Sequence, residues 1–186
     1  MTKKSVLVLA AVSTVLIAGV GATAQSRDDA GFVPQHRRGR LRADLRSFNE
    51  VPTLSTGARG SFFGTLSEDE TEIQYRLDYG GLEGPVVMSH IHLGATHTSG
   101  GVSIWLCGTA SSPGPNLTPV CGDAGGAGPE ATGTLTATGV VGPAGQGVAV
   151  GEFAELVKAI KAGVTYVNVH STAFPGGEIR GQIKLD

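Results

Sequence analysis

The sequence lacks the motifs by which several large enzyme classes are identified. It contains no Gly-rich phosphate-binding loop and no nucleophile elbow. It also shows no internal repeat and no heptad pattern. Phosphate-loop enzymes, hydrolases with that elbow, repeat proteins and coiled coils are therefore not expected, and no catalytic residue is predicted.

An excess of positive charge is also missing. The chain has 14 Lys and Arg against 16 Asp and Glu, a formal net charge of −2. Removing residues 1–24 would remove two Lys and no acid, which takes this charge from −2 to −4. Nucleic acid is therefore not an expected partner. Arginines crowd residues 37–46, where they form either a solvated tail or a contact to an anionic surface.

Cysteine is scarce, with only Cys107 and Cys121 in 186 residues. In an exported chain, an even pair separated by Pro- and Gly-rich sequence most simply forms a disulfide. The alternative is that the two thiolates bind a metal, but their spacing is wider than that of a zinc knuckle.

The one long apolar segment lies at the N-terminus. Lys3 and Lys4 precede an apolar run from Val6 to about Val20, and Ala22-Thr23-Ala24 has the small-x-small pattern of a signal peptidase site. We predict a signal peptide at 1–24 and a secreted or periplasmic protein without a transmembrane helix after cleavage. A single-pass anchor is the competing interpretation, although the run is shorter than a membrane helix needs.

The rest of the chain suits one domain. Residues 25–40 have the composition of a disordered leader, and 41–186 form the predicted domain, with a Gly/Pro-rich insertion at about 107–150. Strands are predicted at 41–48, 61–67, 72–79, 86–93, 102–106, 132–141, 165–171 and 178–185. A helix is predicted at 152–162, where an i, i+3, i+4, i+7 apolar stripe precedes Gly163.

The many short strands and 29 glycines indicate an all-β fold. We predict an antiparallel β-sandwich or barrel, immunoglobulin-like or Cu/Zn superoxide dismutase-like, with one short helix. The clearest strand is 72–79, in which apolar and polar residues alternate strictly. One face of that strand is expected to be buried and the other wet.

Histidines provide the candidate site. His90 and His92 are one residue apart on a predicted strand, so their side chains share a face. His170 lies on the polar side of the strand at 165–171. If the two strands are neighbours, the three imidazoles can hold Cu or Zn and leave one coordination position open. The alternative is a structural network in which the ring nitrogens hydrogen-bond within the protein.

Four further residues are candidate supports for this site. Glu50 and Glu178 can supply an oxygen ligand or an acceptor that fixes a histidine tautomer. Asn168 shares the polar side of its strand with His170, and Arg180 shares a face with Glu178. The Glu178 and Arg180 pair can pin a turn through a charge-assisted network or act as a catalytic acid with its Arg.

Four segments together resemble the CHRD family, the domain named after chordin and found in exported bacterial proteins. They are NEVP at 49–52, EIQYRLDYGGL at 72–82, SHIHLGA at 89–95 and YVNVHSTAFPGGEIRGQI at 166–183. The resemblance implies a compact, extracytoplasmic, β-rich domain and no defined activity. Chordin-like proteins combine this domain with Cys-rich growth-factor-binding repeats, which are missing here, so growth-factor antagonism is not expected.

The His-x-His strand also resembles the copper-binding strand of Cu/Zn superoxide dismutases. Those enzymes hold two metals with more histidines than this chain offers, so dismutase activity is not expected. Three functions stay open. The favoured one is a non-enzymatic binding or scaffolding module for an unknown protein or cell-envelope partner, with a metal at the three histidines. The others are a mononuclear metalloenzyme of the cell envelope and a purely structural cell-surface domain.

Overall fold

The computed structural model describes residues 39–115, 117–123 and 130–186. The predicted signal peptide and nearly all of the predicted leader lie outside the described residues. The strands of the described part are β1 (Arg40–Arg46), β2 (Arg59–Leu66), β3 (Ile73–Gly80), β4 (Val86–Leu93), β5 (Gly101–Gly108), β6 (Ala131–Leu135), β7 (Thr165–Ser171), β8 (Ile179–Gln182) and β9 (Lys184–Leu185). One α-helix, α1 (Phe153–Lys161), and three short 3₁₀ helices, η1 (Ser47–Asn49), η2 (Ala137–Gly139) and η3 (Ala144–Gln146), complete it.

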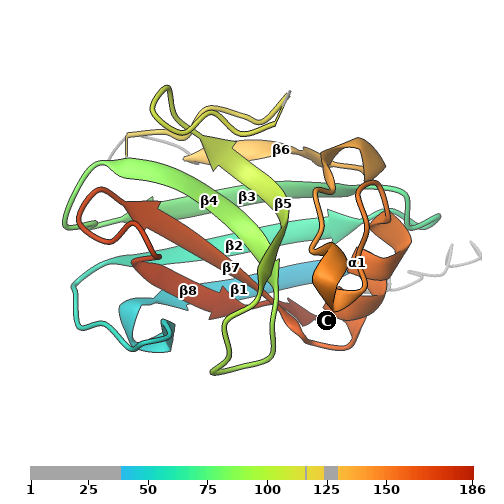
Figure 1. The fold of residues 1–186 in the computed structure, drawn as a ribbon, viewed down its shortest axis with the longest axis horizontal. Helices are drawn as coiled ribbons and strands as arrows, with labels where there is room; N and C mark the ends of the chain where they lie inside the picture. The colour runs from blue at the N-terminus through green and yellow to red at the C-terminus, as the bar shows by residue number, and fades with distance from the viewer. Residues whose placement is uncertain (1–38, 116, 124–129) are drawn as a thin grey trace, which may run out of the picture. The chain divides into compact units, whose positions relative to one another are not determined.

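These strands form one antiparallel sheet that nearly closes on itself. The order is β5-β4-β7-β8-β1-β2-β3-β6, with β9 beside β1. The two ends of the order approach each other after β6, where Val140 bridges to Ile104 and the Val141 N–H donates to the Ser103 carbonyl at 2.9 Å. The predicted all-β, barrel-like class with one short helix is confirmed. In Figure 1, β4, β7 and β8 lie side by side although about 75 residues separate β4 from β7 in the chain.

Alternation along the strands builds the core. In β1 every second residue is buried, so Leu41, Ala43 and Leu45 face inward while the charged residues between them, Arg42 and Asp44, face solvent. The same alternation in β2 and β3 buries Phe62 and Tyr75, whose rings stack with centroids 6.1 Å apart. The Tyr75 hydroxyl crosses the interior and donates to the Leu106 carbonyl on β5. This bond ties β3, the neighbour of the end strand β6, to the other end strand β5 from inside.

Helix α1 is amphipathic, as predicted, and its apolar side chains join the same core. Phe153, Leu156, Val157 and Ile160 are buried. The helix ends where Gly163 adopts a left-handed φ of 70°, a conformation that glycine takes without a Cβ penalty. Among the described residues, no helix has the length and apolarity needed to cross a membrane.

Two predicted strands differ from the structure. The strand predicted at 132–141 is shorter, because the chain leaves the ladder after Leu135 and turns through η2 before Val140 reaches β5. The strand predicted at 178–185 is divided into β8 and β9, which pair with different parts of β1. Both differences arise where a strand stops pairing with its neighbour. At such places tertiary contacts, more than the local preference for strand, decide the structure.

A disulfide joins Cys107, near the end of β5, to Cys121, and both residues are buried. It closes a loop with a sequence separation of 14. Removing it in a Cys107→Ala, Cys121→Ala variant should lower the free energy of unfolding by about 3 kcal/mol, because the unfolded chain regains the entropy of an open loop. Urea unfolding with and without reductant checks this. Reductant should lower the stability of the wild type alone, and an equal change in the variant would contradict the assignment.

Candidate metal centre

A regular ladder between β4 and β7 brings the three histidines to one face of the sheet. Its cross-strand pairs include Met88 with His170, His90 with Asn168, and His92 with Tyr166. Since alternate residues of a strand share a face, these six side chains form a two-column grid on the side opposite the apolar core. His90 lies diagonally across from His170, which is within reach of a side-chain contact.

Loops cover this face, so its polar side chains are buried. Every residue of β7 is buried, and His90, His92 and His170 are only 2%, 8% and 5% exposed. Loop 94–100 and loop 172–177 supply carbonyl groups to these side chains, as the following contacts show. The histidines therefore lie in a polar layer enclosed between the sheet and its own loops.

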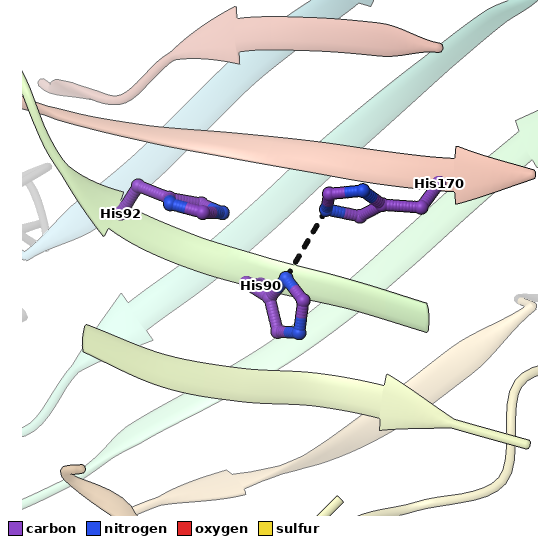
Figure 2. A group of neighbouring side chains, drawn as sticks. All are labelled: His90, His92 and His170. Atoms are coloured by element: carbon purple, nitrogen blue, oxygen red, sulfur yellow. Dashed lines mark hydrogen bonds between the residues drawn. The ribbon is translucent and has the colours of Figure 1, made fainter. Parts of the chain in front are cut away.

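The three imidazoles converge. His90 Nδ1 lies 3.2 Å from His170 Nε2, and one ring nitrogen from each histidine lies within 4.8 Å of the other two. Figure 2 shows the rings of His92 and His170 turned toward each other, with His90 beside them. Three nitrogens bound to one tetrahedral ion are about 3.3 Å apart, so a modest contraction would complete such a set.

Backbone carbonyls fix two of the three tautomers. His92 Nδ1 lies 3.0 Å from the Gly100 carbonyl oxygen, and His170 Nδ1 lies 2.9 Å from that of Pro175. A carbonyl can only accept, so each Nδ1 carries the proton and donates it. The lone pair of each ring is consequently on Nε2, the nitrogen that faces the cluster. Metal-bound histidines are commonly held in this way.

Two ring nitrogens of the cluster have no hydrogen-bond partner among the described residues. They are His90 Nε2 and His92 Nε2, and both are buried. The His90 ring packs edge to face against Trp105, with centroids 4.2 Å apart. In a purely structural network, buried nitrogens are normally satisfied. The lone pair of His92 Nε2 lies near the Asn168 side chain without a hydrogen bond of good geometry, so it is available as a metal ligand.

Burial keeps the three imidazoles neutral. Desolvation, followed by the neighbouring histidines, lowers the pKa of His90 to about 3. Desolvation also lowers the pKa of His92 to about 4, against the hydrogen bond to Gly100, and lowers that of His170. At neutral pH each ring is uncharged and carries a single N–H, which leaves one nitrogen free to bind a metal.

Asn168 lies against the cluster. Its side-chain oxygen, Oδ1, is 2.9 Å from His170 Nε2, and its side chain also hydrogen-bonds to Glu50. Since the Pro175 carbonyl accepts the Nδ1 proton of His170, Nε2 is an acceptor here, and the Nδ1–H of His90 at 3.2 Å is the donor suited to it. Asn168 thus links the histidine cluster to Glu50.

The two predicted acidic supports, Glu50 and Glu178, are not among the potential metal ligands. Among the described residues, the group of potential ligands contains only the three histidines. Glu178 is fully buried and accepts a hydrogen bond from the Glu83 N–H at 2.9 Å. Burial raises the pKa of Glu50 to about 7, opposed by Arg180, a backbone bond to Val51 and Asn168. The contacts that orient the rings come from carbonyl groups instead.

A stack of three side chains continues from the cluster across β7 to β8. The His92 ring lies parallel to the Tyr166 ring with centroids 4.8 Å apart, and the Arg180 guanidinium lies 3.3 Å from the centre of the Tyr166 ring. Tyr166 and Trp105 were not among the predicted site residues. Strand alternation with Asn168 and His170 signals Tyr166 in the sequence, whereas no local pattern signals Trp105.

A comparison with family models matches most of the chain. Residues 41–183 match the CHRD domain. The chain belongs to the CHRD family. Searches among curated proteins and among solved structures returned no match. The match extends over all three histidines of the cluster, and CHRD membership together with the disulfide is consistent with an extracytoplasmic location.

Proposed function

We propose that this protein is an exported, non-enzymatic CHRD binding or scaffolding module that holds a transition metal through His90, His92 and His170. The observation that carries the proposal is the convergence of three neutral imidazoles, two of them oriented by carbonyls and two with a buried Nε2 that has no hydrogen bond of good geometry. Neutral imidazole suits both copper and zinc. The N-terminal pattern of residues 1–24 and the disulfide support export.

A metal at this place would fasten β4 to β7. Two ligands come from β4 and one from β7, and the rings already lie against each other. Because the site is assembled only in the folded chain, binding free energy would add to folding free energy. The ion would thus stabilise the surface that the module presents to a protein or cell-envelope partner.

Burial makes the metalloenzyme alternative weaker. Catalytic metals keep a coordination position open to a cleft. None of the three histidines lines the surface hollow bordered by Arg42, Arg180 and Lys184, and all three are at most 8% exposed. A substrate would have to displace the loops that supply the carbonyls of Gly100 and Pro175.

Addition of Cu²⁺ or Zn²⁺ to the metal-stripped protein should raise its melting temperature. At a free metal concentration of one hundred times Kd, the stabilisation is about 2.7 kcal/mol, which corresponds to roughly 5–10 °C for a domain of this size. Differential scanning calorimetry measures the shift. A His90→Ala, His92→Ala variant, compared with its own metal-free form, should show none.

The matched control is His97→Asn, which changes an exposed histidine outside the cluster. His97 has a left-handed φ of 63°, and asparagine tolerates that conformation. This variant should keep the full shift. No shift with either metal, or a shift that persists in the double variant, would refute the metal site.

A further inference from the structure

A second site is suggested by a hollow of about 530 Å³ beside the histidine layer. Its lining comes from β1, β8, β9, η1 and loop 94–100, and includes Arg42, Asp44, Arg180 and Lys184. The volume lies in the range of sites that bind small molecules. The three imidazoles are not part of this lining, so the hollow is separate from the proposed metal centre.

Arg180 lines this hollow, and its charge is buried without an ion pair. The residue is 3% exposed, and no carboxylate of the described residues lies within ion-pair distance of its guanidinium. Its contacts are the Ala95 carbonyl, 3.1 Å from Nη2, and the face of the Tyr166 ring. These contacts orient the guanidinium without neutralising it, whereas buried charges in proteins are normally paired.

Glu50 is the carboxyl that acts on the charge of Arg180, but it compensates that charge incompletely. It acts on Arg180 electrostatically and forms no ion pair with it, and Oε1 of Glu50 has no hydrogen-bond partner. Burial raises the pKa of Glu50 to about 7, so near neutral pH this carboxyl is partly protonated. The carboxyl of Glu50 therefore neutralises the positive charge of Arg180 at the hollow only in part.

The remaining charges of the lining add to this excess. Arg42 and Lys184 contribute two more cations against the single acid Asp44. Arg42 shares its charge with Asp186 at 3.0 Å, while Lys184 has no ion pair among the described residues. A ligand entering the hollow thus meets the buried Arg180, the exposed Lys184 and an exposed Arg42 that is paired with Asp186.

We propose that this hollow binds the anionic oxygen group of a small ligand, a carboxylate or a phosphate, with Arg180 at its floor and Lys184 and Arg42 at its rim. The planar guanidinium matches such groups with two parallel hydrogen bonds. Stacking on Tyr166 and the bond to Ala95 hold Arg180 in place before the ligand arrives, which lowers the cost of binding. The proposal does not depend on a metal at the histidines.

Titration of the metal-free protein with inorganic phosphate and, separately, with succinate at constant ionic strength tests the site. Nitrogen-15 NMR should show saturable shifts of the Arg180 side-chain Nε–H signal and of the backbone signals of Lys184 and Thr96. Saturation by phosphate indicates a phosphorylated ligand, and saturation by succinate a carboxylate ligand. No saturable shift with either anion at millimolar concentration would overturn the proposal.

Variants separate a built site from general electrostatics. An Arg42→Gln, Lys184→Gln variant should weaken anion binding about tenfold, as expected for loss of charge-assisted contacts. Arg180→Lys keeps the charge and removes the fork, so it should also weaken binding. Arg59→Gln removes an exposed charge outside the lining and should leave Kd unchanged within about twofold. Equal weakening by Arg59→Gln would overturn the proposal.

Discussion

The metal-free protein should lose stability steeply as the pH falls from about 6.5 to about 4. In the unfolded chain a histidine takes up its proton near its ordinary pKa of 6.5, whereas burial lowers the pKa of His90 to about 3 and that of His92 to about 4. Below pH 6.5 the unfolded state therefore binds protons that the folded state does not. By linkage, each of these two histidines should cost about 2 kcal/mol at pH 5.

Glu50 acts with the opposite sign. Its pKa rises from an ordinary value of 4.5 to about 7 in the folded state, so the folded state binds the extra proton and gains stability as the pH falls through this window. Between pH 7 and pH 5 this gain is about 2 kcal/mol, which offsets one of the two histidines. Below about pH 4.5 Glu50 is protonated in both states and offers no further offset. The net loss should therefore steepen at the acid end.

Urea unfolding at a series of pH values measures this dependence. His90→Gln removes one group that takes up a proton only on unfolding, so its stability should depend less steeply on pH than that of the wild type. His97→Asn, with its exposed side chain, should follow the wild-type curve. If the free energy of unfolding depended equally steeply on pH in His90→Gln and in the wild type between pH 6.5 and 4, the conclusion that His90 is buried and neutral would be wrong.

Gly177→Ala should destabilise the protein by about 3 kcal/mol, whereas Gly176→Ala should have almost no effect. Gly177 has a φ of 123°, a region that side chains rarely adopt. A Cβ at this position would lie 2.6 Å from Asn168 Nδ2 and 2.7 Å from Glu50 Oε1. Both groups are buried and cannot retreat freely, so overpacking adds to the backbone strain.

The neighbouring glycine is the matched control for this substitution. A Cβ at Gly176 would meet nothing within 4 Å, and its φ lies outside the positive region. Its replacement reduces the entropy of the unfolded chain and should be neutral or slightly stabilising. Equilibrium unfolding of the two variants side by side checks the difference. Equal stabilities would show that loop 172–177 shifts to accommodate the added Cβ, and that Gly177 is not required for packing against Asn168 and Glu50.

Strand and helix positions were largely predictable because they depend on local periodicity. The alternation along 72–79 anticipates the buried face of β3, and the apolar stripe at 152–162 anticipates α1. Prediction was poorest at 132–141, where Gly, Ala and Thr carry little periodic signal and a nonlocal bridge to Ile104 decides where the ladder ends.

The sequence by itself determined that His90 and His92 share a face, because strand geometry makes residues i and i+2 neighbours. Motif likeness also singled out His170 as the third histidine. Only the tertiary structure decided that β4 and β7 are partners in a register that places His170 diagonally opposite His90. It likewise decided that carbonyls of Gly100 and Pro175 orient the rings, since a backbone carbonyl has no signature in the identity of its residue. The tertiary structure also decided that the charge of Arg180 has no ion-pair partner, because ion pairing depends on which distant groups the closed sheet brings near the guanidinium.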